Sequence, residues 1–182
     1  MGDIEKLTVH TIGHSTRKIG DFMVLLEENG IRQLVDIRTI PRSRHNPQYG
    51  SDELSASLES VGIKYIHMAS LGGLRRPLKN SPNGGWRNDS FRGFADYMQT
   101  SEFGKGIDAL ILLAQDRDTA IMCAEAVPWR CHRSLVSDAL FVRGVHVWHI
   151  MGTRVKNQHK LTPFARVDGI AVIYPPIEQP LF

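Results

Sequence analysis

The chain has 182 residues, 42% of them hydrophobic and 23% charged, and its formal net charge is +3. These values suit one globular domain with a full core, and the charge is too small to indicate a nucleic-acid binder by itself. The longest apolar run is far below the about 18–20 residues that a membrane-spanning helix needs. Residues 1–6 lack the apolar segment of a signal peptide. We therefore expect a cytoplasmic protein without a membrane segment, whose two cysteines are reduced.

Strands and helices alternate along the predicted chain. Residues 7–12 alternate along the segment with β-branched side chains and stop at Gly13, a pattern typical of a strand. From Ile19 to Leu26, apolar residues recur at helical spacing, which predicts a helix. The connection over 71–88 is rich in Gly, Pro, Asn and Arg, and its length favours a functional or mobile loop. The complete set of predicted strands is 7–12, 34–37, 64–68, 119–123 and 145–150, with a possible edge strand over 170–174, and helices are predicted between them.

This alternation predicts a single α/β domain over residues 1–182, a three-layer sandwich around a mostly parallel sheet with strand order 3-2-1-4-5. Residues 167–182 form a C-terminal extension. In this order the winding direction switches between the first and fourth strands. Open parallel sheets bind their ligands in the crevice at such a switch point. The loops at His14-Ser15, Asp36–Arg44 and 123–133 are expected to border that crevice.

The densest group of reactive side chains lies between Cys123 and Arg133. Cys131 is predicted at the start of a helix, where backbone N–H groups favour an anion and the neighbours His132 and Arg133 lower a thiol pKa. Cys131 is therefore a candidate nucleophile, with His132 as its proton partner. Cys123 is expected to pack as a small apolar side chain. A redox pair of the two cysteines is an alternative.

A metal site is a less favoured alternative. The two cysteines and His132 supply at most three ligands, adjacent residues rarely bind one ion together, and the fourth ligand would have to come from His14 or Glu125. We therefore assign no metal and no cofactor from the sequence.

Two acidic residues have two interpretations each. Glu125 lies among arginines just after a predicted strand, so it either orients an arginine or serves as a catalytic acid or base. Asp36 lies inside an apolar strand and has the same two interpretations. Its carboxylate must reach either a partner, for which Arg38 is the candidate, or the end of the strand.

The segment 38–45 resembles an anion-binding loop, because it contains Arg38, Arg42 and Arg44 together with Ser43. The glycines Gly72 and Gly73 permit a close approach of the backbone to the same ligand. A solvent-exposed basic loop without a ligand is the alternative. The predicted partner is an anionic small molecule or the backbone of a nucleic acid.

Several separated motifs, taken together in order, resemble the bacterial family called domain of unknown function 488. The resemblance implies a compact α/β fold in a cytosolic bacterial protein, and it implies no particular reaction or cofactor. It covers residues 11 to 166, and its motifs are Thr11-Ile-Gly-His-Ser15, Val35-Asp-Ile-Arg38, Pro41-Arg-Ser-Arg44, Leu71-Gly-Gly73, Cys123-Ala-Glu125, Cys131-His-Arg133 and His159-Lys-Leu-Thr-Pro163.

The leading hypothesis is an enzyme that binds a phosphate-bearing ligand. Its catalytic residues would be Cys131, His132 and Glu125, and the predicted ligand-binding residues are His14, Ser15, Asp36, Arg38, Arg42, Ser43, Arg44, Gly72, Gly73, Cys123 and Arg133. The alternatives are a nucleic-acid-binding protein without catalysis and a cysteine-based metal or redox sensor.

Overall fold

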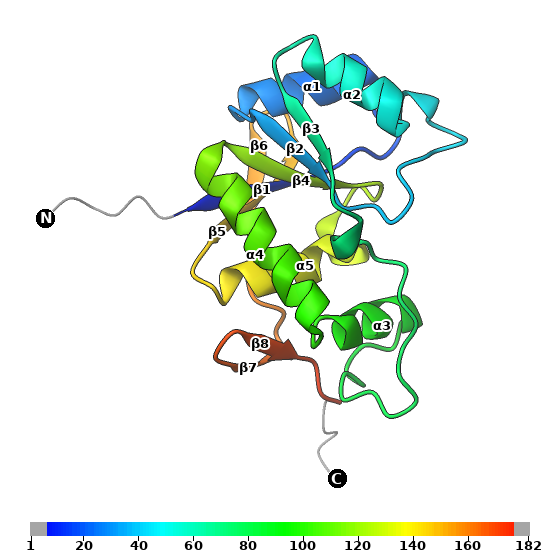
Figure 1. Ribbon diagram of the computed structural model, residues 1–182, viewed down its shortest axis with the longest axis vertical. Coiled ribbons are helices and arrows are strands. Elements are labelled where there is room, and N and C mark those ends of the chain that lie inside the picture. Colours follow the sequence, from blue (N-terminus) through cyan, green and yellow to red (C-terminus); the bar gives the residue numbers. More distant parts are fainter. Residues whose placement is uncertain (1–6, 177–182) are drawn as a thin grey trace, which may run out of the picture.

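The computed structural model describes residues 7–176 as a mixed α/β fold in three layers (Figure 1). Helices α1 (Ile19–Glu28) and α2 (Ser51–Glu59) cover one face of the sheet, and α4 (Ser101–Asp116) and α5 (Arg133–Phe141) cover the other. Within this range no helix is both long and apolar enough to cross a membrane. The sheet consists of β1 (Thr8–Gly13), β2 (Gln33–Asp36), β3 (Lys64–His67), β4 (Thr119–Cys123), β5 (His146–Gly152) and β6 (Val155–Gln158).

The pleat of β4 divides its side chains between the two cores. Ala120 and Met122 pack with α1 and α2, whereas Ile121 and Cys123 pack with α4 and α5. Successive residues of a strand point to opposite faces, so a strand buried on both faces is apolar throughout. This alternation places the Cys123 thiol on the side of the sheet from which α5 begins.

The strand order differs from the prediction. The sheet runs β3-β2-β4-β1-β5-β6, so β4 lies between β2 and β1 instead of outside β1. All five residues of β4 are buried, and this strand therefore takes a central position with a parallel neighbour on each side. The predicted adjacency of β1 and β4 holds, with Gly13 opposite Cys123. The loops after β2, β4 and β1 consequently leave the sheet side by side.

The tail of the chain also differs from the prediction. Strand β6 pairs antiparallel with β5 and forms an edge that the sequence pattern did not indicate. The predicted edge strand over 170–174 instead pairs, as β8 (Ala171–Ile173), with β7 (Arg166–Asp168) in a separate two-stranded sheet. Part of the predicted extension, residues 177–182, lies outside the described residues.

The long connection over 71–88 is held in place by polar contacts. Asp96 of α3 (Asp89–Tyr97) accepts hydrogen bonds from the Leu78 amide, the Ser81 hydroxyl and the Asn83 side chain, at 2.6–2.8 Å. The side-chain oxygen Oδ1 of Asn83 in turn accepts from the Tyr174 amide at 2.8 Å. The connection is thus anchored to both α3 and the C-terminal region, and it positions Gly73 beside the carboxyl end of β4.

Candidate functional site

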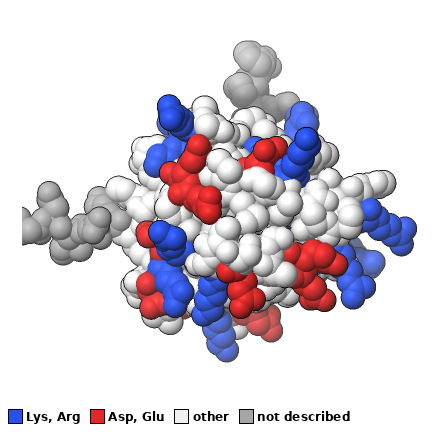
Figure 2. All heavy atoms as spheres, turned by 90° about the horizontal axis from the view of Figure 1, so that it is seen from above, with Lys and Arg blue, Asp and Glu red and all other residues white. Residues whose placement is uncertain are grey.

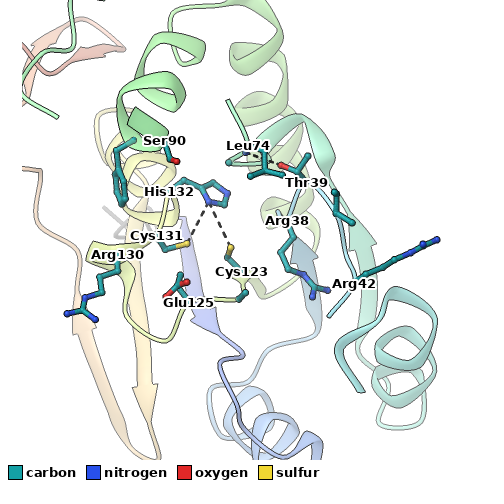
Figure 3. A pocket seen from close by; sticks show the side chains of 14 residues that line it. Arg38, Thr39, Arg42, Leu74, Ser90, Cys123, Glu125, Arg130, Cys131 and His132 are labelled. Atoms are coloured by element: carbon teal, nitrogen blue, oxygen red, sulfur yellow. Dashed lines mark hydrogen bonds between the residues drawn. The ribbon is translucent and has the colours of Figure 1, made fainter. Parts of the chain in front are cut away.

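A pocket of about 360 Å³ opens at the carboxyl ends of β2 and β4 (Figure 3). We call it the sulfur pocket, because both cysteines of the chain line it. Its walls come from the loop after β2, the glycine segment after β3, the start of α3 and the β4–α5 loop. The lining residues are Arg38, Thr39, Ile40, Arg42, Gly73, Leu74, Ser90, Phe91, Cys123, Ala124, Glu125, Arg130, Cys131 and His132.

The centre of the pocket is a cluster of two thiols and one imidazole. The His132 Nδ1 atom lies 3.7 Å from the Cys131 sulfur and 4.0 Å from the Cys123 sulfur. The other ring nitrogen, Nε2, lies 3.1 Å from the backbone carbonyl of Ile37. A carbonyl oxygen accepts hydrogen bonds and cannot donate them, so Nε2 carries the proton. Nδ1 is therefore the ring nitrogen directed towards the two sulfurs (Figure 3): it presents a lone pair to them when the ring is neutral, and it donates to the Cys131 sulfur when the ring carries a second proton.

The two thiols differ in acidity although both are buried. A hydrogen bond to Cys131, together with burial, raises the pKa of Cys123 above its usual range. Burial also disfavours a Cys131 thiolate, but hydrogen bonds from Cys123 and His132 and the charge of Arg133 outweigh it and lower the pKa of Cys131. Within the pair, the thiolate accordingly belongs to Cys131 and the shared proton to Cys123.

The His132 ring is held tightly on two sides. It meets the Phe94 ring in an edge contact with centroids 5.0 Å apart. On the other side it packs against Gly73, where an added Cβ would lie 2.5 Å from Nδ1 and 2.7 Å from Cγ. The absence of a side chain at Gly73 is therefore what allows the imidazole to face the sulfurs.

Replacing Gly73 with Ala is expected to displace the His132 ring and to lower the free energy of unfolding by about 1–3 kcal/mol, because the site is already fully packed. Gly104→Ala in α4 is the matched control, since an added Cβ there meets nothing within 4 Å. Urea denaturation of both variants measures the difference. Equal stabilities of the two variants would contradict the close packing of Gly73 on His132.

Asp36 and Arg38 form a buried ion pair beside the pocket. The guanidinium donates to both carboxylate oxygens, at 2.6 Å for the shortest contact, and also to the Tyr49 carbonyl at 2.8 Å. Burial disfavours the charged guanidinium, but the hydrogen bonds and charge of Asp36 outweigh it and raise the pKa of Arg38. The Tyr65 hydroxyl donates to the same carboxylate at 2.8 Å. The predicted Asp36–Arg38 pairing is confirmed, and it leaves Arg38 with its charge balanced.

His14 supports this pair from the loop after β1. Its Nδ1 donates to the Ser15 carbonyl at 2.8 Å, so its Nε2 accepts from Arg38 at 3.4 Å. The ring stacks on Tyr49 with centroids 4.1 Å apart. Burial lowers the pKa of His14 to about 4, and the nearby Arg38 charge lowers it as well. His14 is thus a neutral hydrogen-bond acceptor behind the pocket wall at neutral pH.

Arg133 lies behind the cluster and outside the pocket lining. Its side chain is 1% exposed and donates to the Glu125 backbone carbonyl at 2.7 Å. A longer contact, 3.4 Å, reaches the Thr11 hydroxyl. No carboxylate in residues 7–176 pairs with this guanidinium, and its Nε has no partner there. The role supported by these contacts is to hold the loop after β4 and to place a positive charge near Cys131.

The structure brings about half of the sequence-predicted site residues together. Both cysteines, His132, Glu125, Arg38, Arg42 and Gly73 line the sulfur pocket. The others lie outside its lining: His14 and Asp36 behind Arg38, Arg133 behind the thiols, and Ser15, Ser43, Arg44 and Gly72 elsewhere on the neighbouring loops.

Sequence reasoning missed the residues that complete the wall. Ser90 and Phe91 come from the start of α3, which the long connection over 71–88 brings to the pocket. Arg130 lies on the 3-10 turn over Pro128–Arg130, at the rim opposite Arg42 in Figure 3. Its position between the two cysteines is the signal that could have indicated it.

The chain belongs to the family described as domain of unknown function DUF488, whose model matches residues 18–140, more than half of the sequence. The expected family resemblance is thereby confirmed. The match includes both cysteines and His132. No curated protein and no solved structure matches the chain.

Proposed function

We propose that the protein is an enzyme that acts on an anionic, phosphate-bearing small molecule in the sulfur pocket. The observation that carries this proposal is the convergence of unlike reactive groups on one pocket. Two thiols, an imidazole whose Nδ1 faces both sulfurs and the carboxylate of Glu125 all reach the same space of about 360 Å³. A concave site with a few convergent polar groups is where catalysis is expected.

The charges at the rim support an anionic ligand. Arg42 and Arg130 line the pocket from opposite sides, and both side chains are exposed. Neither has an ion-pair partner within residues 7–176, in contrast to Arg38, whose charge Asp36 balances. Guanidinium groups bind phosphate through paired hydrogen bonds. The two rim arginines therefore provide the binding charge, whereas Arg38 lines the wall as part of a charge-balanced pair with Asp36.

Glu125 supports the assignment of acid–base chemistry. Its side chain is exposed to the pocket and forms no hydrogen bond or ion pair in the described part of the chain. The backbone carbonyl of the same residue accepts from Arg133, which fixes the loop while the carboxylate stays available. A free carboxylate beside a binding site is a suitable general acid or base. Cys131 and His132 supply the remaining reactive groups at the floor.

Inorganic phosphate is the probe for the binding claim. Replacing both Arg42 and Arg130 with Ala is expected to weaken phosphate binding, measured by calorimetry, about tenfold or more, because hydrogen bonds to charged groups are lost. Arg32→Ala is the control, since this exposed arginine lies just before β2 at the opposite end of the sheet. Equal weakening by the control would contradict a site at the rim.

Glu125→Gln tests the catalytic claim. With a phosphate ester that the wild type turns over, kcat is expected to fall by about 10²-fold or more, because the proton transfer is lost. Phosphate binding and thermal stability should stay at wild-type values, because the carboxylate has no structural contacts within residues 7–176. A variant with full kcat would remove Glu125 from the mechanism.

A nucleic-acid backbone is the other anionic ligand that the sequence suggests. On the face of the molecule that carries α1 and α2, basic and acidic side chains are interspersed (Figure 2). Such a surface does not favour extended phosphate-backbone contacts there. A steep fall of oligonucleotide affinity with added salt, together with no phosphate-ester turnover, would favour this alternative over the enzyme.

A further inference from the structure

We propose that Cys123, Cys131 and His132 together bind one zinc ion at the floor of the sulfur pocket. The two sulfurs and the imidazole Nδ1 lie within 4.8 Å of one another. Thiolate and imidazole are the donors that zinc prefers in proteins. The ion site stands on this geometry alone, whereas its use in catalysis rests on the proposed function.

The donor spacing fits a tetrahedral ion. With Zn–S near 2.3 Å and Zn–N near 2.0–2.1 Å, a tetrahedral sulfur–nitrogen separation is about 3.6 Å. The observed separations from His132 Nδ1 are 3.7 Å to Cys131 and 4.0 Å to Cys123. Side-chain shifts of a few tenths of an ångström therefore bring each sulfur to the tetrahedral distance from Nδ1. The two sulfurs already lie within 4.8 Å of one another, against about 3.8 Å in a tetrahedral site.

The backbone explains how adjacent residues contribute ligands to the same ion. Cys131 is extended, with φ −137° and ψ 144°, whereas His132 is already helical, with φ −58° and ψ −11°. The chain changes direction between them as α5 begins, so the two side chains converge instead of pointing apart. The objection that neighbouring residues seldom bind one ion does not apply at this turn.

The hydrogen bond from His132 Nε2 to the Ile37 carbonyl orients the imidazole ring as a metal ligand. It holds the ring in the tautomer whose Nδ1 lone pair faces the sulfurs. Histidine ligands of metal ions usually donate their other ring proton to a carbonyl or carboxylate in this way. Phe94 and Gly73 restrict the ring from its two sides. The imidazole is therefore already oriented for an ion.

Charge and access are consistent with a catalytic type of zinc site. Two thiolates balance the charge of Zn²⁺, and the Arg133 backbone N–H donates to the Cys131 sulfur at 3.5 Å. Both sulfurs line the sulfur pocket, so the side of the ion without a protein ligand faces that pocket. Three protein ligands with one open position are typical of catalytic zinc, whereas structural zinc has four.

The open position assigns a reaction class to the enzyme proposed above. Zinc polarises a water molecule, which gives one proton to Glu125 while its oxygen forms a bond to the phosphorus of the bound ester. The bond from phosphorus to the leaving oxygen breaks, and Glu125 returns the proton to that oxygen. The overall reaction is hydrolysis, with water as the only co-reactant.

Zinc titration of the reduced full-length protein tests the site, with a chromophoric chelator as competitor. We expect one Zn²⁺ per chain, and affinity at least a hundredfold weaker in Cys131→Ser and His132→Gln, since loss of even an outer-shell contact typically costs 10–100-fold. His45→Gln is the control, because His45 is exposed and outside the pocket. Unchanged affinity in the two ligand variants would overturn the proposal.

Cobalt substitution of the wild-type protein gives a test that does not depend on folding of the variants. Co²⁺ at this site is expected to show a thiolate-to-cobalt charge-transfer band and the strong visible absorption of a tetrahedral ion. Weak octahedral absorption without charge transfer, or no binding, would exclude a site at the two cysteines.

The proposed zinc site and the proposed enzymatic function can be refuted independently of each other. If the protein binds phosphate and turns over an ester with full activity after zinc removal, the function stands and the ion site has no role in it. If zinc binds at the cysteines but phosphate does not bind, the ion site stands and the proposed function is wrong. Rapid alkylation of Cys131 that zinc does not slow would also contradict the ion site.

Discussion

Replacing Asp36 with Asn is expected to lower the free energy of unfolding by about 3–5 kcal/mol, because it leaves a buried charge without its partner. Asp36 is fully buried, and its carboxylate accepts from Arg38 and from the Tyr65 hydroxyl. The Asn amide oxygen can still accept from Arg38, as can the Tyr49 carbonyl and the acceptor nitrogen of His14, but none of these groups carries a charge to balance the guanidinium. Urea denaturation at neutral pH measures the loss.

The control for this variant is Asp116→Asn. Asp116 pairs with Arg117 at 3.2 Å, but both side chains are about half exposed or more. Exposed pairs contribute about 0–1 kcal/mol, so the control should unfold close to the wild type. If the two variants lost the same stability, the buried pair would not hold the loop after β2 as described.

Acid is expected to destabilise the protein from about pH 6.5 downwards, through two buried histidines. Burial lowers the pKa of His14 to about 4 and that of His149 to about 3. For His149 the neighbouring His159 and the charge of Arg133 lower the pKa further. In the unfolded chain both imidazoles take up protons near the ordinary value of 6.5. Since the unfolded state then binds more protons, stability falls as pH drops through this range and continues to fall towards the folded pKa values.

Between pH 7 and pH 5 this difference amounts to about 1–2 kcal/mol per histidine. His149 belongs to a directed hydrogen-bond chain. Its Nδ1 accepts from the Thr11 hydroxyl at 2.8 Å, and its Nε2 donates to His159 at 3.0 Å, which in turn donates to Asp138 at 2.8 Å. A proton on His149 would turn the accepting nitrogen into a donor, so the hydrogen bond with Thr11 would have to reverse its direction.

Urea denaturation at pH 7 and pH 5 checks this expectation. His149→Gln should lose stability at pH 7 but show a smaller further loss at pH 5, because one of the two titrating groups is gone. His45→Gln, at an exposed position, should keep the wild-type difference. A wild-type stability that does not change between pH 7 and pH 5 would contradict the burial of neutral His14 and His149.

The elements of the fold were largely predictable from local patterns, whereas their arrangement was not. The five predicted parallel strands occur, because each is a short apolar or β-branched run bounded by glycine or polar residues. The position of β4 between β2 and β1 depends on burial on both faces, and the alternation of strands and helices carries no information on that. Strand β6 is exposed along its whole length and has no apolar face to indicate it.

The site residues were predictable where reactive side chains directly follow a predicted strand. Cys131, His132 and Glu125 follow one strand, and the sheet brings them to the loop after β2. The arginines were harder to place, because their charge pattern does not show which are neutralised. Arg38 is paired with Asp36, and Arg133 is enclosed behind the thiols, so the charge available at the pocket comes from Arg42 and Arg130. Only the tertiary contacts make this distinction.

Residue-by-residue NMR during titration with inorganic phosphate tests most directly whether the sulfur pocket is the functional site. The largest amide shifts are expected at Gly73, Ser90 and Glu125, which line that pocket. A second pocket of about 420 Å³, lined by residues that include Trp129 and Phe164, should stay unchanged. Shifts confined to the second pocket, or no saturable shifts, would contradict the assignment of an anionic ligand to the sulfur pocket.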